Sequence, residues 1–318
     1  DVLGTSSVIR RVVAEGKTLA EMEDPVALIG ENGTGKSFFA QCIHNGSPRA
    51  KKPYIVINAG TIAQQDAARV LFGSDDGAKP RMGLFELAGG GTIALQGLGD
   101  ASEAFFSCLR QVLLQHSYFA VGGVTTIPFS ARLLALVTPE ERRRIPRDLW
   151  EQLSVFSLNL PLLKDRQEDV STLFRFFLLR ESILMPPRTQ KELEEILSFY
   201  SWPANLISLS AVSKRYILLY QQAMNPSPSA KQQILIRAIG EDELLSDIYR
   251  QYPALTDAAN SPPEEVLAGV AAMKRILKYN NSVIADKLGL GRTTLWRIQK
   301  KAGVSDAGED TDSPEPIE

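Results

Sequence analysis

An eight-residue stretch near the start of the chain combines glycines with a lysine and a hydroxyl side chain, a set suited to holding phosphate groups. This stretch fits the pattern G-x-x-x-x-G-K-S and consists of Gly30, Glu31, Asn32, Gly33, Thr34, Gly35, Lys36 and Ser37. Its glycines let the backbone turn tightly, so that N–H groups point at phosphate oxygens. Lys36 would reach the β- and γ-phosphates, and the Ser37 hydroxyl would ligate Mg²⁺. The motif therefore predicts that the chain binds ATP together with Mg²⁺.

The elements around this motif have the order that phosphate binding requires. The apolar run Val26–Ile29 predicts a strand before the loop, and a helix is expected from about Lys36 to Ile43. The helix N-terminus adds partial positive charge where the phosphates would lie. Strand, loop and helix together favour a nucleotide site over a glycine-rich turn without a ligand.

A second apolar run, Thr92–Leu95, follows three glycines and is typical of a buried parallel strand. In nucleotide hydrolases such a strand usually ends in acids that hold Mg²⁺ and polarise water, whereas Gln96 and Gly97 follow it here. Because an amide supplies neither charge nor a base, no residue of this chain is assigned a catalytic role.

Basic side chains are concentrated between residues 274 and 301, where eight lysines and arginines stand against one acid, Asp286. Such charge is typical of a segment that contacts nucleic-acid phosphates. The pattern predicts three helices, at about 264–279, 282–288 and 292–301. We expect this segment to be a helix-turn-helix that binds double-stranded DNA.

In a helix-turn-helix the second helix enters the major groove, with its early residues facing the bases. The residues expected to contact bases are Arg292, Thr293, Thr294 and Arg297, and those expected to contact phosphates are Lys300 and Lys301. Phosphate contacts position the protein without reading the sequence. Ser282 is expected to be the N-cap of the preceding helix.

Six segments occur in an order that resembles a known family. They read GENGTGKS, RVLFG, GLFELAGGGTIAL, LPLLKDRQEDV, SWPANL and NNSVIADKLGLGRTTLWRIQKKAGV. Over about residues 1–304, apart from 226–262, the chain is similar to the AAA+ enhancer-binding regulators that act with sigma-54 RNA polymerase, joined to a Fis-type helix-turn-helix. The resemblance implies an α/β fold, in which a P-loop AAA+ domain has a parallel sheet and a helical lid, plus a small all-α DNA-binding domain.

The resemblance also implies a division of the chain. The expected parts are an AAA+ domain at 1–160, a helical lid at 161–225, a linker with a possible helix at 226–263, the helix-turn-helix at 264–304 and a tail at 305–318. The tail has six acids and no base and is expected to be disordered. Many members of the family carry a sensory domain before the AAA+ domain, which would explain why the sequence begins without a methionine.

The chain departs from the family at the positions that carry hydrolysis and the sigma-factor contact. The loop GAFTGA, which touches the sigma factor in the family, is replaced by the shorter SDDGAKPRM. The family's acidic pair corresponds to Gln96 and Gly97, and its two arginine fingers correspond to Pro146 and Gln152. Its first sensor corresponds to Thr138, and its second sensor corresponds to Ile207. Hydrolysis needs a held metal, a polarised water and an arginine that neutralises phosphoryl charge. These departures predict that hydrolysis is lost.

We interpret the chain as a sequence-specific DNA-binding bacterial transcriptional regulator whose AAA+ domain binds ATP but has lost hydrolysis and sigma-54 remodelling. One alternative is a weakly active ATPase that still activates sigma-54 RNA polymerase, alone or in mixed rings. That ATPase would use Asp76 or Asp100 for the metal and Arg144 or Arg147 in trans. A second alternative is a structural partner that joins rings of an active relative. The implied partners are double-stranded DNA, RNA polymerase and further copies of the chain, in a dimer or a hexameric ring.

The composition agrees with an ordinary globular protein. The chain has 318 residues and a net charge of −2, from 35 basic and 37 acidic residues. Cys42 and Cys108 lie in apolar contexts and predict core residues of a reduced, cytoplasmic protein, with neither a disulfide nor a zinc site. No apolar run has the length that spans a membrane, so no membrane partner is expected.

Overall fold

The computed structural model describes residues 4–75, 80–224 and 226–301, which form two compact units. The α/β unit comprises Asp1–Phe176 and Trp202–Ala211, and the helical unit comprises Phe177–Ser201 and Val212–Glu318. Within the described part of the chain, no helix is both long and apolar enough to cross a membrane.

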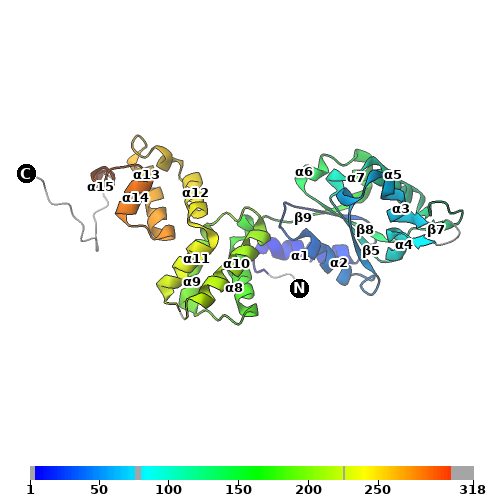
Figure 1. Ribbon diagram of the computed structural model, residues 1–318, viewed down its shortest axis with the longest axis horizontal. Helices are drawn as coiled ribbons and strands as arrows, with labels where there is room; N and C mark the ends of the chain where they lie inside the picture. Colours follow the sequence, from blue (N-terminus) through cyan, green and yellow to red (C-terminus); the bar gives the residue numbers. More distant parts are fainter. Residues whose placement is uncertain (1–3, 76–79, 225, 302–318) are drawn as a thin grey trace, which may run out of the picture. The chain divides into compact units, whose positions relative to one another are not determined.

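A parallel sheet of five strands forms the centre of the α/β unit, with the strand order β2-β5-β8-β1-β9 (Figure 1). The strands are β1 (Val26–Ile29), β2 (Tyr54–Asn58), β5 (Thr92–Gln96), β8 (Arg132–Val137) and β9 (Phe156–Asn159). Because all five run in the same direction, their carboxyl ends meet at one edge, where ligands bind in open α/β sheets. The predicted α/β class with a parallel sheet is confirmed.

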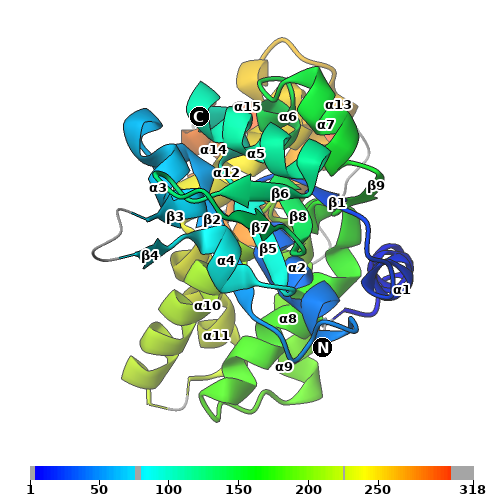
Figure 2. The same ribbon diagram turned by 90° about the vertical axis from the view of Figure 1, so that its right-hand side faces the viewer.

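Helices cover both faces of this sheet, as Figures 1 and 2 show. The helices of the unit are α1 (Ser7–Ala20), α2 (Lys36–Asn45), α3 (Ala67–Phe72), α4 (Leu84–Ala88), α5 (Glu103–Gln115), α6 (Pro139–Arg142) and α7 (Arg147–Leu153). Apolar side chains of α1 and α2 form one core cluster with the sheet, and those of α3, α4, α5 and α7 form another.

Alternation along the strands explains the two clusters. In β8, Leu134 and Leu136 belong to the cluster with α1 and α2, whereas Leu133, Ala135 and Val137 belong to the cluster on the opposite face. Successive strand residues point to opposite faces, so a strand buried on both sides must be apolar throughout. This requirement is the reason that the central strands read as continuous hydrophobic runs.

Two small hairpins complete the unit. Strand β3 (Gly73–Ser74) pairs with β4 (Arg81–Met82), and β6 (Ser117–Phe119) pairs with β7 (Thr126–Pro128). The shortened loop lies in the first hairpin, and its residues 76–79 are outside the described part of the chain.

The helical unit contains the remaining helices. They are α9 (Pro187–Phe199), α11 (Pro228–Ile239), α12 (Glu241–Gln251), α13 (Pro263–Ala272) with a π turn at Met273–Leu277, α14 (Asn281–Lys287) and α15 (Arg292–Lys301). Two further helices, α8 (Gln167–Arg180) and α10 (Asn205–Gln222), have residues in both units. The stretch 226–263, where a linker with one possible helix is predicted, holds both α11 and α12. The division into domains stays a prediction, and the acidic tail lies outside the described residues.

Candidate functional site

The loop Gly30–Gly35 joins the end of β1 to the start of α2, at the carboxyl edge of the sheet. Gly33 and Gly35 have φ angles of +78° and +101°, which L side chains rarely adopt. Gly35 is the N-cap of α2 and supplies no side-chain hydrogen bond. The first N–H groups of an α-helix have no partner within the helix, and such groups can donate hydrogen bonds to an anion.

The side chain of Lys36 is folded over this loop. Its Nζ donates hydrogen bonds to the carbonyl oxygens of Gly30, at 2.7 Å, and Glu31, at 3.0 Å. Burial lowers the pKa of Lys36, while the carboxylates of Glu141 and Glu31 oppose that shift. The lysine thus lies where its ammonium would meet a phosphate bound by the loop.

Gln96 is the last residue of β5, and at the carboxyl edge of the sheet it contacts Ser37 at the start of α2. Its amide Nε2 donates a hydrogen bond to the Ser37 hydroxyl at 3.0 Å. The next residue, Gly97, has a φ of +63°, and a Cβ there would lie 2.5 Å from Asn58 Oδ1. A carboxylate at position 97 would therefore require both a strained backbone and movement of Asn58.

The described residues that a weakly active ATPase would use for metal binding and charge neutralisation all form ion pairs. The Arg144 guanidinium forms an ion pair with Asp100, and Arg147 pairs with Glu151 one turn along α7. All four side chains are largely exposed. Asp76, the other candidate metal ligand, lies outside the described residues. Asp100, Arg144 and Arg147 thus each have a neighbour of opposite charge.

Thr138, at the position of the family's first sensor, follows β8 and begins α6. Its hydroxyl accepts a hydrogen bond from the Glu141 backbone N–H at 3.1 Å, and its own N–H donates to Glu141 Oε2 at 2.7 Å. This reciprocal pair is a capping box. Thr138 therefore has a role in starting the helix that sequence reasoning did not assign.

Asn205 binds the phosphate loop and was missed by sequence reasoning. Its Nδ2 donates to the Asn32 carbonyl at 2.9 Å, and its Oδ1 accepts from the Leu163 N–H at 2.8 Å. The neighbouring Leu206 N–H donates to the Gly33 carbonyl at 3.0 Å. Asn205 has a φ of +52°, a conformation that asparagine tolerates better than most residues. This preference of asparagine is the one local feature of SWPANL that indicates the backbone conformation at this position.

Two buried charged residues of the segment after β9 were also missed. Arg166 is only 4% exposed, its Nη2 lies 3.5 Å from the Thr34 carbonyl, and burial lowers its pKa. Asp169, in α8, accepts hydrogen bonds from the backbone N–H groups of Thr5 and Ser6 and from the Ser6 hydroxyl. These contacts join the N-terminal residues and the phosphate loop to the segment that leads into α8.

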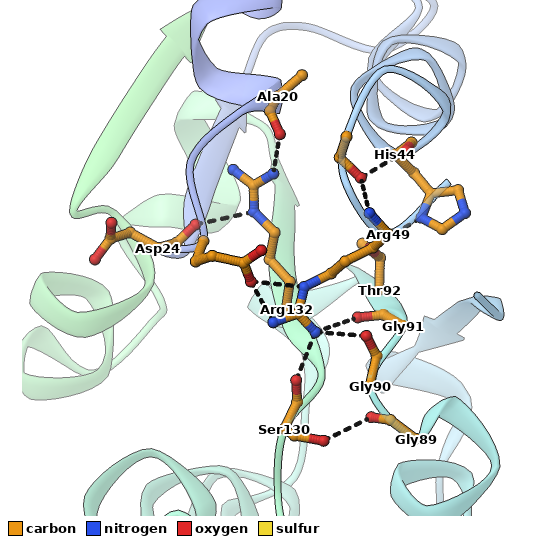
Figure 3. Close-up of polar contacts among 12 residues, drawn as sticks. Ala20, Asp24, His44, Arg49, Gly89, Gly90, Gly91, Thr92, Ser130 and Arg132 are labelled. Atoms are coloured by element: carbon orange, nitrogen blue, oxygen red, sulfur yellow. Dashed lines mark hydrogen bonds and ion pairs between the residues drawn. The ribbon is translucent and has the colours of Figure 1, made fainter. Parts of the chain in front are cut away.

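A separate polar cluster holds the turns that precede the strands (Figure 3). Arg49 donates to the carbonyls of Gly90, at 2.6 Å, and Ser130, at 2.6 Å, and forms an ion pair with Glu23. A Cβ at Gly91 would lie 2.0 Å from the Pro53 carbonyl oxygen, so the turn before β5 requires glycine. The three glycines that precede this strand thus serve its packing.

The last three helices lie near the predicted positions, with one correction. Ser282 is not the N-cap of α14, because Asn280 has that position and its side chain accepts a hydrogen bond from the Val283 N–H at 2.9 Å. Asparagine is as good a cap as serine, so residue type alone does not separate Asn280 from Ser282. Gly289 has a φ of +64° and directly follows Leu288, the C-cap of α14.

The predicted DNA-contacting residues lie along α15. Arg292, Thr293, Arg297 and Lys300 are exposed, Thr294 is half-buried, and the side chain of Lys301 is outside the described part. Leu295 is buried, so the helix has a packed face and a basic face. The Lys300 ammonium lies over the Trp296 ring, 4.8 Å from its centroid.

Comparison with known proteins assigns the family. Residues 2–159 match the family model described as Sigma-54 interaction domain. DNA-binding transcriptional activator HyfR of Escherichia coli K12 is 29% identical, over 96% of this chain and 48% of HyfR. A Nif-specific regulatory protein of Sinorhizobium fredii is 34% identical, over 70% of this chain and 39% of that protein. The chain thus spans about half the length, or less, of these relatives.

Solved structures agree with this assignment. A crystal structure of NtrX from Brucella abortus has a TM-score of 0.66 at 25% identity and covers 95% of this chain and 69% of that chain. The structure of NtrX with ADP has a TM-score of 0.68 at 23% identity and covers 96% of this chain and 70% of that chain. The structure of NtrX with ATP has a TM-score of 0.62 at 24% identity and covers 96% of this chain and 69% of that chain. The α/β fold with its phosphate loop is therefore an AAA+ fold, and the chain belongs to the family of transcriptional regulators that contain the sigma-54 interaction domain.

Proposed function

We propose that this chain is a cytoplasmic, DNA-binding transcriptional regulator whose α/β unit binds an adenine nucleotide without hydrolysing it. The observation that carries the proposal is the contact between Gln96 and Ser37 at 3.0 Å, because it joins an intact phosphate loop to a strand end without an acid. The crystal structures of NtrX with ADP and ATP support nucleotide binding in a fold of this kind.

The loss of hydrolysis follows from the chemistry of the groups at the sheet edge. An attacking water needs a base or a metal to polarise it, and the transferring phosphoryl group needs a neutralising arginine. Gln96 is neutral, Thr138 caps α6, and Arg144 is paired with Asp100. Removal of an arginine finger alone typically lowers such rates by about 10³-fold or more.

The residues at the site fit Mg²⁺ poorly. Mg²⁺ prefers oxygen ligands, commonly one or two carboxylates together with phosphates and waters. The predicted protein ligand is the Ser37 hydroxyl, which accepts an N–H from Gln96. Within the described residues, no group of three or more His, Cys, Asp or Glu side chains could hold a metal ion. Any Mg²⁺ would reach this site with the nucleotide, through Ser37 and the phosphates alone.

DNA binding is proposed for α15 and the helices beside it. Two features support this proposal. The exposed basic face of α15 carries Arg292, Arg297 and Lys300, and a short turn at Gly289 precedes the helix. Helices presented in this way enter the major groove. RNA polymerase and further copies of the chain, in a dimer or a hexameric ring, are the proposed protein partners.

The nucleotide proposal is tested by measuring phosphate release and ATP binding on the purified chain, with Lys36→Ala as the control. We expect wild-type phosphate release to equal that of Lys36→Ala, while only the wild-type chain binds ATP. Phosphate release clearly above the control would instead favour the weakly active ATPase. That result would direct the search to Asp100 and Arg144, whose substitution should then abolish the rate.

The regulatory proposal is tested by footprinting the chain on promoter DNA and by reporter expression in cells with and without sigma-54. We expect protection of a defined sequence and regulation that persists without sigma-54. Regulation that disappears with sigma-54 would show that the remodelling function has been kept.

A further inference from the structure

The Gln96 amide contacts the Ser37 hydroxyl, which is the protein group that would hold a metal ion. In a phosphate loop of this pattern, the hydroxyl after the lysine is the protein's own ligand to Mg²⁺. Here an amide N–H points at the Ser37 oxygen at 3.0 Å and occupies one of the two lone pairs of the hydroxyl. A partially positive N–H group thus lies on the side of Ser37 from which a cation would approach.

We propose that this site binds nucleotide without a divalent cation, and that the Gln96 amide donates a hydrogen bond to a phosphate oxygen in the cation's place. The inference rests on the proposed nucleotide binding of the α/β unit. An amide nitrogen carries two hydrogens, and the contact with Ser37 uses one of them. The second hydrogen is the donor assigned to the phosphate.

Electrostatics explains why the loss of the acids removes the need for the cation. Where a strand ends in two carboxylates, they and the phosphates repel one another at short range, and only a cation between them makes the arrangement favourable. Gln96 and Gly97 carry no charge, so this repulsion is absent at the end of β5. The phosphates then meet Lys36, the N-terminus of α2 and the amide of Gln96, all of which attract anions.

The nearest carboxylates have other partners or are screened by solvent. Glu141 influences the pKa of Lys36, but its Oε2 accepts the Thr138 N–H at 2.7 Å. Asp100 forms an ion pair with Arg144. Glu31 lies in the loop itself, and its exposed carboxylate is screened by solvent. A cation beside Ser37 would therefore gain little from these groups.

The test is the affinity of the full chain for ADP, measured by titration calorimetry with excess Mg²⁺ or with EDTA. We expect the two dissociation constants to agree within about twofold. Gln96→Glu returns a carboxylate of the same size and should make binding depend on Mg²⁺, with EDTA weakening it about tenfold or more. Gln96→Ala should bind ADP about tenfold more weakly than wild type in EDTA, because a hydrogen bond to a charged group is lost.

The matched control is Gln115→Glu. Gln115 ends α5, which runs back from the carboxyl edge of the sheet to the opposite edge, and its side chain is exposed. This variant adds the same charge and should bind ADP like wild type in both buffers. Circular dichroism checks that each variant is folded, and the comparison of the two buffers on the wild-type chain needs no variant at all.

Each outcome decides one of the two ideas. Wild-type binding that requires Mg²⁺, or Gln96→Ala that binds as well as wild type in EDTA, overturns the role of Gln96 and leaves the nucleotide site intact. The absence of ADP binding in both buffers overturns the nucleotide site, and the inference with it.

Discussion

Arg132 is a buried charged residue whose hydrogen-bond partners are backbone carbonyls. Arg132 is 3% exposed and donates to the carbonyls of Ala20, at 3.3 Å, and Asp24, at 3.1 Å (Figure 3). It also donates to the Leu19 carbonyl at 2.7 Å. The last carbonyls of a helix have no partner within it, so one guanidinium at the first residue of β8 completes the end of α1. A single side chain thereby fixes a helix to the sheet.

We predict that Arg132→Met lowers the free energy of unfolding by about 2–4 kcal/mol. The substitution removes three hydrogen bonds, and each such bond contributes about 0.5–1.5 kcal/mol. Urea denaturation, followed by circular dichroism, measures the change. Arg147→Met is the control, because Arg147 is exposed and forms one ion pair with Glu151; an equal loss in both variants would contradict the prediction.

His44 gives the α/β unit a dependence on pH. It is 4% exposed, and its Nδ1 lies 2.9 Å from Thr92 Oγ1. Burial lowers the pKa of His44 below its ordinary value. As the pH falls through the ordinary value of about 6.5, the unfolded chain takes up a proton that the folded chain does not, so stability decreases.

We therefore expect the thermal midpoint of the wild-type chain to fall on acidification from about pH 7.5 to about pH 5.5. His44→Gln should show a smaller fall, because glutamine does not titrate. Thermal melts at a series of pH values measure both. The other histidine, His116, is exposed, and His116→Gln should keep the wild-type dependence.

At the scale of elements, the phosphate loop is held by chain that follows it by more than a hundred residues. Asn205 and Leu206, at the start of α10, bind the carbonyls of Asn32 and Gly33. A Cβ at Gly33 would lie 2.1 Å from the Ala204 carbonyl oxygen, so the two segments approach as closely as glycine permits. The conformation of the loop thus depends on a helix start outside the motif.

We predict that Asn205→Ala lowers the free energy of unfolding by about 3 kcal/mol. Two hydrogen bonds contribute about 1 kcal/mol each, and alanine at a left-handed φ costs about 1 kcal/mol more. Asn205→Gly is the matched variant, since it loses the hydrogen bonds but tolerates the conformation, and it should lose about 2 kcal/mol. Equal effects of alanine and glycine in urea denaturation would show that the backbone conformation contributes nothing.

At the scale of the whole molecule, the net charge of −2 conceals a basic segment. Proteins that bind DNA release counterions, so the affinity falls with salt according to the number of phosphates that are neutralised. The proposed DNA-binding surface lies in the helical unit, on α15. The contribution of this surface to the salt dependence of DNA binding can be separated from the contribution of lysines elsewhere in the same unit.

We predict that Lys300→Ala weakens binding to duplex DNA to a similar degree for all sequences and reduces the slope of log K against log salt by about one. Fluorescence anisotropy at several salt concentrations measures this slope. Lys191→Ala, an exposed residue of α9, should leave it unchanged. A slope that Lys300→Ala does not alter would place the phosphate contacts elsewhere.

Local features of the fold could be predicted from the sequence. The phosphate loop follows from the spacing of its glycines, lysine and serine, and the buried strands follow from apolar runs such as Thr92–Leu95. The three helices after residue 262 follow from periodicity and from the glycine at 289. The choice of Asn280 over Ser282 as a cap could not be predicted, because both are good caps and their separation is two residues.

The arrangement of the candidate site depended on tertiary structure. Gln96 and Ser37 are 59 positions apart, and the sequence indicated a missing acid without showing what the amide contacts. Asn205, Arg166 and Asp169 carry no local signal of their contacts with the loop and the N-terminal residues, because those contacts form only when strands, loop and helix starts are packed. Residue types determined that the chain has a phosphate loop and a strand without acids. Packing alone decided that Gln96 faces Ser37, since the direction of a side chain between distant segments depends on the fold that brings them together.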